Sequence, residues 1–132
     1  MSVVLDCSYA LACVLPDEPK PASMAAVLGE VLYVPFIWPI EIANAIRSAV
    51  RSKRLDASGA SSFIGQVASL GAQVVSPWHD DAARYLDWAM QHDLSACDAI
   101  YLDLCLGERK RLATCDRRLA RAAERVGIRT LM

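Results

Sequence analysis

The chain has 132 residues, of which 55% are apolar and 22% are charged. This length suits one domain of about 100 to 150 residues, and the composition excludes an intrinsically disordered protein. The net charge of −1 differs from that of a uniformly basic nucleic-acid-binding protein. We therefore expect a single globular domain over residues 1–132.

Neither a secretory signal nor a membrane helix is indicated. The N-terminal residues lack a basic region and a sustained apolar stretch, and the most apolar segment, residues 31–40, is about half the ~20 residues that span a bilayer. The five cysteines form no Cys-x-x-Cys pair and no Cys/His cluster, which argues against a disulfide framework and a zinc site. We expect a soluble cytoplasmic protein whose cysteines are small buried side chains. Redox control is the alternative for Cys7, Cys97 and Cys115, which adjoin acidic residues.

The N-terminal third alternates short β-branched runs with helical patterns. A strand at residues 3–5 ends at Asp6, and residues 8–15 are apolar enough for a buried helix. After a proline-containing loop, a second helix is expected to end at Gly29, before a strand at residues 31–34. This pattern predicts a first strand-helix-strand crossover.

The middle of the chain repeats the alternation. Pro39 suits the first turn of a helix with apolar residues at helical spacing, and it places Glu41 in that turn. Asp56 is the expected cap of a helix that runs to about residue 70, where a glycine ends it and a strand follows at residues 72–75.

The C-terminal part completes the pattern. Helices are expected over about residues 80–91 and 95–106, followed by a strand at about residues 112–114. Asp116 starts a last helix, which a glycine ends before a final strand at residues 128–131. Strands that alternate with helices need crossover connections and form parallel sheets covered on both faces. We predict an α/β fold, a three-layer α/β/α sandwich around a mainly parallel sheet of about five strands.

Four acidic residues fall where such a sheet binds its ligands, beyond the carboxyl ends of strands or at helix starts. They are Asp6, Glu41, Asp98 and Asp116. Three of them, taken singly, are better explained as local features: Asp98 as part of a capping box with Ser95, Asp116 as a helix N-cap, and Glu41 as a first-turn acid. Asp6 has no such explanation.

Convergence of the four acids would require compensation. Two unit charges ~5 Å apart repel by about 3 kcal/mol at an effective dielectric constant near 20. A hard divalent cation that prefers oxygen ligands, Mg²⁺ or Mn²⁺, removes this cost. Such an ion polarises a phosphoryl oxygen and lowers the pKa of bound water, which permits phosphodiester hydrolysis without a protein nucleophile.

Four motifs give the chain a likeness to a known family. They are Val4-Leu5-Asp6-Cys7-Ser8, Trp38-Pro39-Ile40-Glu41-Ile42-Ala43-Asn44, Ser95-Ala96-Cys97-Asp98-Ala99-Ile100-Tyr101 and Ala113-Thr114-Cys115-Asp116-Arg117-Arg118-Leu119. With these motifs the chain resembles PIN-domain ribonucleases, most closely the VapC-type toxins of toxin-antitoxin pairs. Each motif is weak alone, but the four in this order extend over nearly the whole chain and are specific together.

The resemblance implies a Mg²⁺- or Mn²⁺-dependent endoribonuclease. It implies that one or two metal ions are held by four catalytic acids, Asp6, Glu41, Asp98 and Asp116. Ser8, Asn44 and Thr114 would orient these carboxylates or metal-bound water, with a solvent-facing helical position as the alternative for Asn44. The resemblance also implies a homodimer, an antitoxin whose C-terminal segment places a basic side chain among the acids, and structured RNA such as tRNA as the substrate.

Several other polar and aromatic residues are set aside. Asp103 departs from the family pattern and lies about 140° around a helix from Asp98, so it is excluded from the metal ligands. His79 and His92 match no motif and are expected at the surface. Core or interface positions are expected for the three tryptophans, Trp38, Trp78 and Trp88.

Basic residues are unevenly distributed. Residues 107–132 carry eight Lys/Arg against three Asp/Glu, a local charge of +5. A second basic cluster comprises Arg47, Arg51, Lys53 and Arg54. Both can contact phosphates. A solvated helix face explains Arg117, Arg121 and Arg125 equally well, because they lie at i, i+4 and i+8 opposite apolar residues.

Other functional classes fit less well. A phosphorylatable receiver domain needs an acidic pair after the first strand, an acceptor Asp after the third and a Lys after the last, and these are missing. A haloacid-dehalogenase-like phosphatase needs a second Asp where Ser8 stands. The remaining alternative is a non-catalytic PIN-fold module that binds RNA or a protein.

Overall fold

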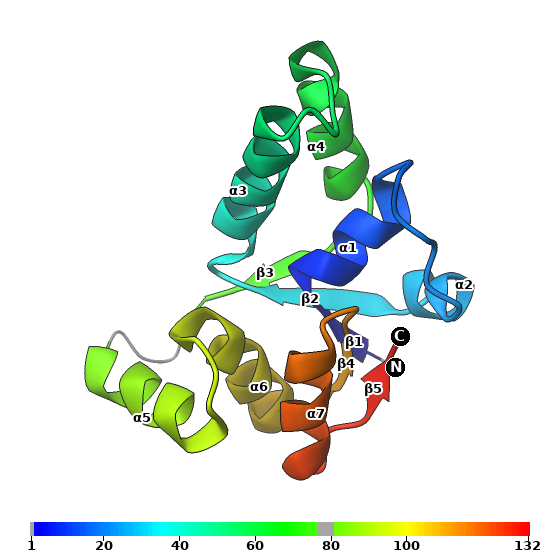
Figure 1. Ribbon diagram of the computed structural model, residues 1–132. Helices are drawn as coiled ribbons and strands as arrows, with labels where there is room; N and C mark the ends of the chain where they lie inside the picture. Colours follow the sequence, from blue (N-terminus) through cyan, green and yellow to red (C-terminus); the bar gives the residue numbers. More distant parts are fainter. Residues whose placement is uncertain (1, 77–80) are drawn as a thin grey trace.

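A five-stranded parallel sheet forms the centre of the structure, a computed structural model that describes residues 2–76 and 81–132 (Figure 1). The strands are β1 (Ser2–Leu5), β2 (Val31–Pro35), β3 (Gln73–Val75), β4 (Arg111–Ala113) and β5 (Thr130–Leu131). Their order is β3-β2-β1-β4-β5, and each neighbouring pair is parallel. The predicted fold class is confirmed.

Helices cover both faces of this sheet (Figure 1). They are α1 (Cys7–Val14), α2 (Met24–Leu28), α3 (Trp38–Arg51), α4 (Ala60–Ala68), α5 (Ala82–His92), α6 (Ala96–Glu108) and α7 (Arg117–Arg125). On one side α1, α3 and α4 contact one another, and on the other α6 packs on β1, β2 and β4 beside α5. Parallel strands need such crossovers, and here the crossovers produce the three layers. No helix within the described residues is long and apolar enough to cross a membrane.

Strand β1 has no polar face, because the core covers it on both sides. Val3, Val4 and Leu5 are all fully buried, as is typical of a parallel strand covered on both sides. Tyr9 from α1 and Tyr101 from α6 are also fully buried. Each such large side chain contributes on the order of 1.5 to 3 kcal/mol through burial of apolar surface.

The strand order brings two chain segments together at one edge of the sheet. The chain leaves β1 toward β2 on one side, whereas β4 lies on the other side of β1, so the connection order reverses between β1 and β4. Leu5 is paired with Ala113, and the Asp6 N–H donates to the Ala113 carbonyl at 2.9 Å. Ligand sites of open α/β sheets lie at such reversals, beyond the strand carboxyl ends. The residues after β1 and β4 therefore define the place to look for a site.

Helix boundaries differ from prediction where the caps differ. The Asp56 side chain makes no capping hydrogen bond, and a 3₁₀ turn (Ala57–Gly59) precedes α4. Asp81 caps α5 by accepting from the Ala83 N–H at 2.9 Å, so this helix begins slightly later than expected.

The final strand is shorter than predicted because the end of α7 uses its first residues. Gly127 has a φ of +82°, and the Ile128 N–H donates back to the Ala123 carbonyl at 2.9 Å. A glycine in this left-handed conformation commonly closes a helix in this way. The predicted stop at a glycine is confirmed, and β5 begins only at Thr130.

The expected surface position of His92 is wrong. This side chain is 8% exposed and stacks on Trp88 with ring centroids 5.0 Å apart. Trp38 is buried and Trp88 packs against the core, as expected. Trp78 and His79 lie outside the described residues.

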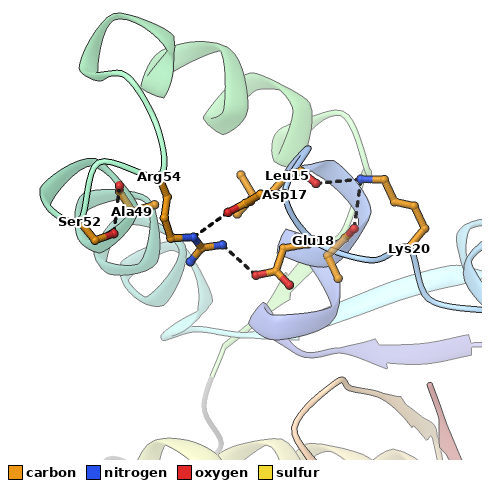
Figure 2. Close-up of polar contacts among 8 residues, drawn as sticks. Leu15, Asp17, Glu18, Lys20, Ala49, Ser52 and Arg54 are labelled. Carbon is orange, nitrogen blue, oxygen red and sulfur yellow. Dashed lines mark hydrogen bonds and ion pairs between the residues drawn. The ribbon is translucent and has the colours of Figure 1, made fainter.

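One member of the second basic cluster is already neutralised (Figure 2). Arg54 donates from Nε to Asp17 at 2.8 Å and from a terminal nitrogen to Glu18 at 2.9 Å, which joins the end of α3 to the loop after α1. Lys20 caps carbonyls of α1 and its end, at 3.0 Å from the Leu15 oxygen. Two carboxylates therefore compete with any phosphate for Arg54.

Candidate functional site

Asp6 is the most buried acid of the structure's described part, with 5% of its surface exposed. One of its oxygens, Oδ2, accepts hydrogen bonds from the Ser8 hydroxyl at 2.6 Å and from the Thr114 hydroxyl at 2.8 Å. Asp6 precedes α1, but its side chain makes no capping bond to that helix. A carboxylate that is buried and oriented in this way, without a capping role, requires another explanation.

The two hydroxyls connect the start of α1 to the loop between β4 and α7. Thr114 Oγ1 also accepts from the Asp116 N–H at 3.0 Å, and Ser8 Oγ accepts from the Cys115 N–H at 3.1 Å. Because every hydroxyl both donates and accepts, the loop that carries Asp116 is held at a defined position beside Asp6. The structure thus brings Ser8 and Thr114, both predicted near the acids, into direct contact with Asp6.

Glu41 lies in the first turn of α3 and is half-buried. Its Oε1 accepts a hydrogen bond from the Tyr101 hydroxyl at 2.6 Å. Tyr101 is fully buried on α6, three residues after Asp98, so Asp98 and Tyr101 lie on the same side of that helix. Tyr101 has no predicted role, although its three-residue spacing from Asp98 was a usable signal.

Asp98 and Asp116 are each tied to a helix N-terminus. The Asp98 N–H donates to Ser95 Oγ at 3.1 Å, which makes Ser95 the cap of α6. Asp116 caps α7 itself, since its Oδ1 accepts from the Arg118 and Leu119 N–H groups at 2.9 and 3.3 Å. The local explanation predicted for Asp116 is therefore confirmed, and only Oδ1 takes part in this capping.

The acids influence one another electrostatically. Burial raises the pKa of Asp6, hydrogen bonds from Ser8 and Thr114 lower it, and the charge of Asp98 raises it further. Burial likewise raises the pKa of Glu41, and the charges of Asp6 and Asp98 add to that effect. For Asp98, burial raises the pKa first and the charge of Asp116 next. The four carboxylates thus form one coupled group at the edge identified by the strand order.

A hard divalent cation suits this donor set. The coupled groups offer only carboxylate oxygens, and the basic side chain that lowers the pKa of any of the raised acids is Arg118, which acts on Asp98. Within residues 2–76 and 81–132, no three His, Cys, Asp or Glu side chains are gathered closely enough to hold a metal ion as they stand. A metal ion bound by these carboxylates would therefore require them to move closer together than they stand.

Asn44 and Asp103 lie apart from the contacts among the acids. Asn44 is exposed on α3, and its side chain makes no hydrogen bond to the described residues. The described part of the structure therefore shows no contact that supports the predicted role of Asn44 beside Glu41. Asp103 lies 3.5 Å from Arg84 in an ion pair on the far part of α6, in agreement with its exclusion from the acidic group.

The cysteines divide into two groups. Cys13 and Cys105 are buried, as expected, but Cys97 and Cys115 are exposed, so the expected burial is wrong for these two. Cys97 follows the cap of α6 and Cys115 follows the end of β4, where the chain faces the sheet edge rather than the core. Burial, with the charges of Asp6 and Glu41, raises the pKa of the Cys7 thiol to about 12. Cys7 is therefore a neutral thiol at neutral pH and not a nucleophile.

The Tyr101–Glu41 hydrogen bond should have a measurable effect on stability. Tyr101→Phe is expected to lower the free energy of unfolding by about 2 kcal/mol, because hydrogen bonds to charged groups contribute more than neutral ones. Tyr9→Phe is a matched control: Tyr9 is equally buried, and its hydroxyl bonds to the neutral Ser23 hydroxyl at 2.8 Å. Urea denaturation should show a smaller loss for Tyr9→Phe, of about 1 kcal/mol. Equal losses would mean that the carboxylate partner is unimportant.

Comparisons with known proteins identify the family and agree with the fold. The chain matches the PIN domain family over residues 3–125. Its fold is similar to that in the crystal structure of PAE2754 from Pyrobaculum aerophilum, with a TM-score of 0.74 and 22% identity over 98% of this chain and 83% of that chain. No curated protein is similar enough to count as a relative. The chain belongs to the PIN domain family, whose members are typically nucleases.

Proposed function

We propose that this protein is a metal-dependent ribonuclease that hydrolyses phosphodiester bonds with a metal-activated water. The observation that carries the proposal is the coupled group of Asp6, Glu41, Asp98 and Asp116 at the reversal of the strand order. Acids with raised pKa values at a ligand-binding edge, here Asp6, Glu41 and Asp98, are typical of functional sites. RNA as the substrate is supported by the resemblance of four motifs to PIN-domain ribonucleases.

Some side chains would hold the metal ion, and others would orient those ligands. Asp6, Glu41, Asp98 and Asp116 would hold Mg²⁺ or Mn²⁺ through carboxylate oxygens. When bound, the ion acts as a Lewis acid on the phosphate and lowers the pKa of a coordinated water.

The remaining contacts fix the carboxylates. Ser8 and Thr114 hold Oδ2 of Asp6, which leaves Oδ1 outside these two bonds. Tyr101 restrains Glu41 from the buried side. Hydrogen-bond partners of this kind orient metal ligands and commonly contribute 10- to 100-fold to affinity or activity.

Purified protein, freed of any bound partner, is expected to cleave transfer RNA when Mg²⁺ or Mn²⁺ is added. Excess chelator should stop the reaction and renewed Mn²⁺ should restore it, as followed on a denaturing gel. Cleavage that continues in chelator would contradict the metal mechanism. RNA that is bound but left intact with either metal would favour the non-catalytic alternative.

We also propose that the protein is the toxin of a type II toxin-antitoxin pair and acts in the cytoplasm as a homodimer. The support is the resemblance to VapC-type toxins, together with a coupled carboxylate group that a guanidinium from an antitoxin can neutralise. The neighbouring reading frame should encode a short DNA-binding-type protein with a basic tail. If that product leaves RNA cleavage unchanged when added in excess, the toxin assignment is wrong.

A further inference from the structure

A hollow lies along one side of α7. It has a volume of about 630 Å³, and its lining residues come from α7 and from the turn between α5 and α6. They are Asp93, Arg118, Arg121, Glu124 and Arg125. We refer to Arg118, Arg121 and Arg125, at positions i, i+3 and i+7 of one helix side, as the α7 arginine face.

Two acidic residues also line this hollow, and each has a partner. Glu124 accepts a hydrogen bond from the Thr130 hydroxyl at 3.0 Å, and Asp93 lies 3.5 Å from Arg118. In the part of the chain that the structure describes, Arg121 and Arg125 form no ion pair. Arg118 also donates to the Asp93 backbone carbonyl at 2.8 Å, which holds this arginine in place, whereas its exposed ion pair with the Asp93 carboxylate is weak. With three arginines against two acids, the lining carries a net charge of +1, and its two unpaired arginines are Arg121 and Arg125.

The positive charge lies on the helix that begins at the acidic group, as expected for a surface that guides an anionic substrate to the acids. α7 begins directly after Asp116, so Arg118 lies only two residues beyond one of the acids. From Arg118 to Arg125 the helix advances about 10 Å. The α7 arginine face thus extends outward from the acids in a single line, whereas the opposite side of α7 is buried against the sheet.

We propose that the α7 arginine face binds the phosphate backbone of RNA on one side of the bond that the acids cleave; this inference rests on the proposed function. Guanidinium groups bind phosphate oxygens through paired N–H donors, and unpaired ones lose no internal contact when they do so. Such contacts position a strand without reading its sequence. They also compensate the repulsion between RNA and the carboxylates.

The test is the affinity for a fluorescein-labelled transfer RNA, measured by fluorescence anisotropy in chelator so that the RNA stays intact. Arg121→Gln/Arg125→Gln removes two charges and leaves Arg118 in place. If two phosphate contacts are lost, binding in 0.1 M salt should weaken roughly 25-fold, and the slope of log affinity against log salt should fall by about 1.4. The comparison variant is Arg47→Gln/Arg51→Gln, which removes two exposed arginines of the second basic cluster on α3, the rival candidate for phosphate contacts, and should weaken binding clearly less.

Each outcome decides for or against the surface. If both double variants weaken RNA binding equally, the effect is one of net charge and the proposal is wrong. The proposal is also wrong if Arg121→Gln/Arg125→Gln binds RNA as tightly as the parent protein. If poly-glutamate binds the parent more tightly than RNA does and only that binding is lost in the variant, the face belongs to an acidic protein segment instead. If the parent protein binds RNA but does not cleave it when metal is added, the proposed function is wrong, whereas the role of the α7 arginine face in RNA binding is unaffected.

Discussion

Asp98→Asn is expected to lower the rate of metal-dependent RNA cleavage by at least about 100-fold while the protein stays folded. Loss of a residue that only orients a metal ligand already costs about 10- to 100-fold, so loss of a ligand charge should cost more. The fold should tolerate the change, because the cap of α6 uses the Asp98 backbone N–H and the Ser95 hydroxyl. The rate should be measured at saturating Mn²⁺ on protein with an unchanged circular dichroism spectrum.

Asp103→Asn provides the matched control. Asp103 lies on the same helix, and it pairs with Arg84 away from the acidic group. Its substitution should leave cleavage within about twofold of the parent, since it touches no proposed metal ligand. If Asp98→Asn cleaves as fast as Asp103→Asn, the assignment of Asp98 to the metal is wrong.

Asp6→Asn is expected to stabilise the metal-free protein near pH 7. Burial raises the pKa of Asp6 above its unfolded value, so the folded state disfavours the ionised form. The protonated carboxyl is fully tolerated below the unfolded pKa of about 3.9, and stability is lost as the pH rises through the folded pKa. Asparagine removes this loss and still accepts the Ser8 and Thr114 hydrogen bonds. Each unit of raised pKa corresponds to about 1.4 kcal/mol.

Urea denaturation in chelator at several pH values measures the difference between the parent and Asp6→Asn. The gain should be largest near pH 7 and vanish at acid pH. Asp17 acts oppositely, because the hydrogen bond from Arg54 lowers its pKa, but this contribution is common to both proteins and cancels. Asp56→Asn, at an exposed site without a capping bond, should give no gain. A variant less stable than the parent at pH 7 would contradict the electrostatic account of Asp6.

The parts of the fold that sequence reasoning predicted are those with strong local signals. Strand β1 is an apolar run followed by an acid, and Pro39 and Gly127 mark a helix start and stop by their backbone preferences. Alternation of strands and helices was sufficient for the layers. The strand order was not predictable in this way, because it depends on which crossovers pack together rather than on any local segment.

The candidate site was predictable as a set of strand-end and helix-start acids, but not in its contacts. Tyr101 and Glu41 are 60 residues apart in the chain, so no local pattern links them. The burial of His92 was missed, although Trp88, on which it stacks, stands four residues earlier, at the spacing of neighbours on one helix side. Cys97 beside Asp98 is exposed because the sheet edge that gathers the acids is not part of the core.

Calorimetric titration with Mn²⁺ tests most directly whether the four carboxylates form a metal site. The parent protein should bind the ion near pH 7, and Asp6→Asn should lose that binding while it remains folded and, without metal, more stable. The titration needs no RNA, so it separates metal binding from substrate recognition. Unchanged Mn²⁺ affinity in Asp6→Asn would contradict a site centred on this buried carboxylate.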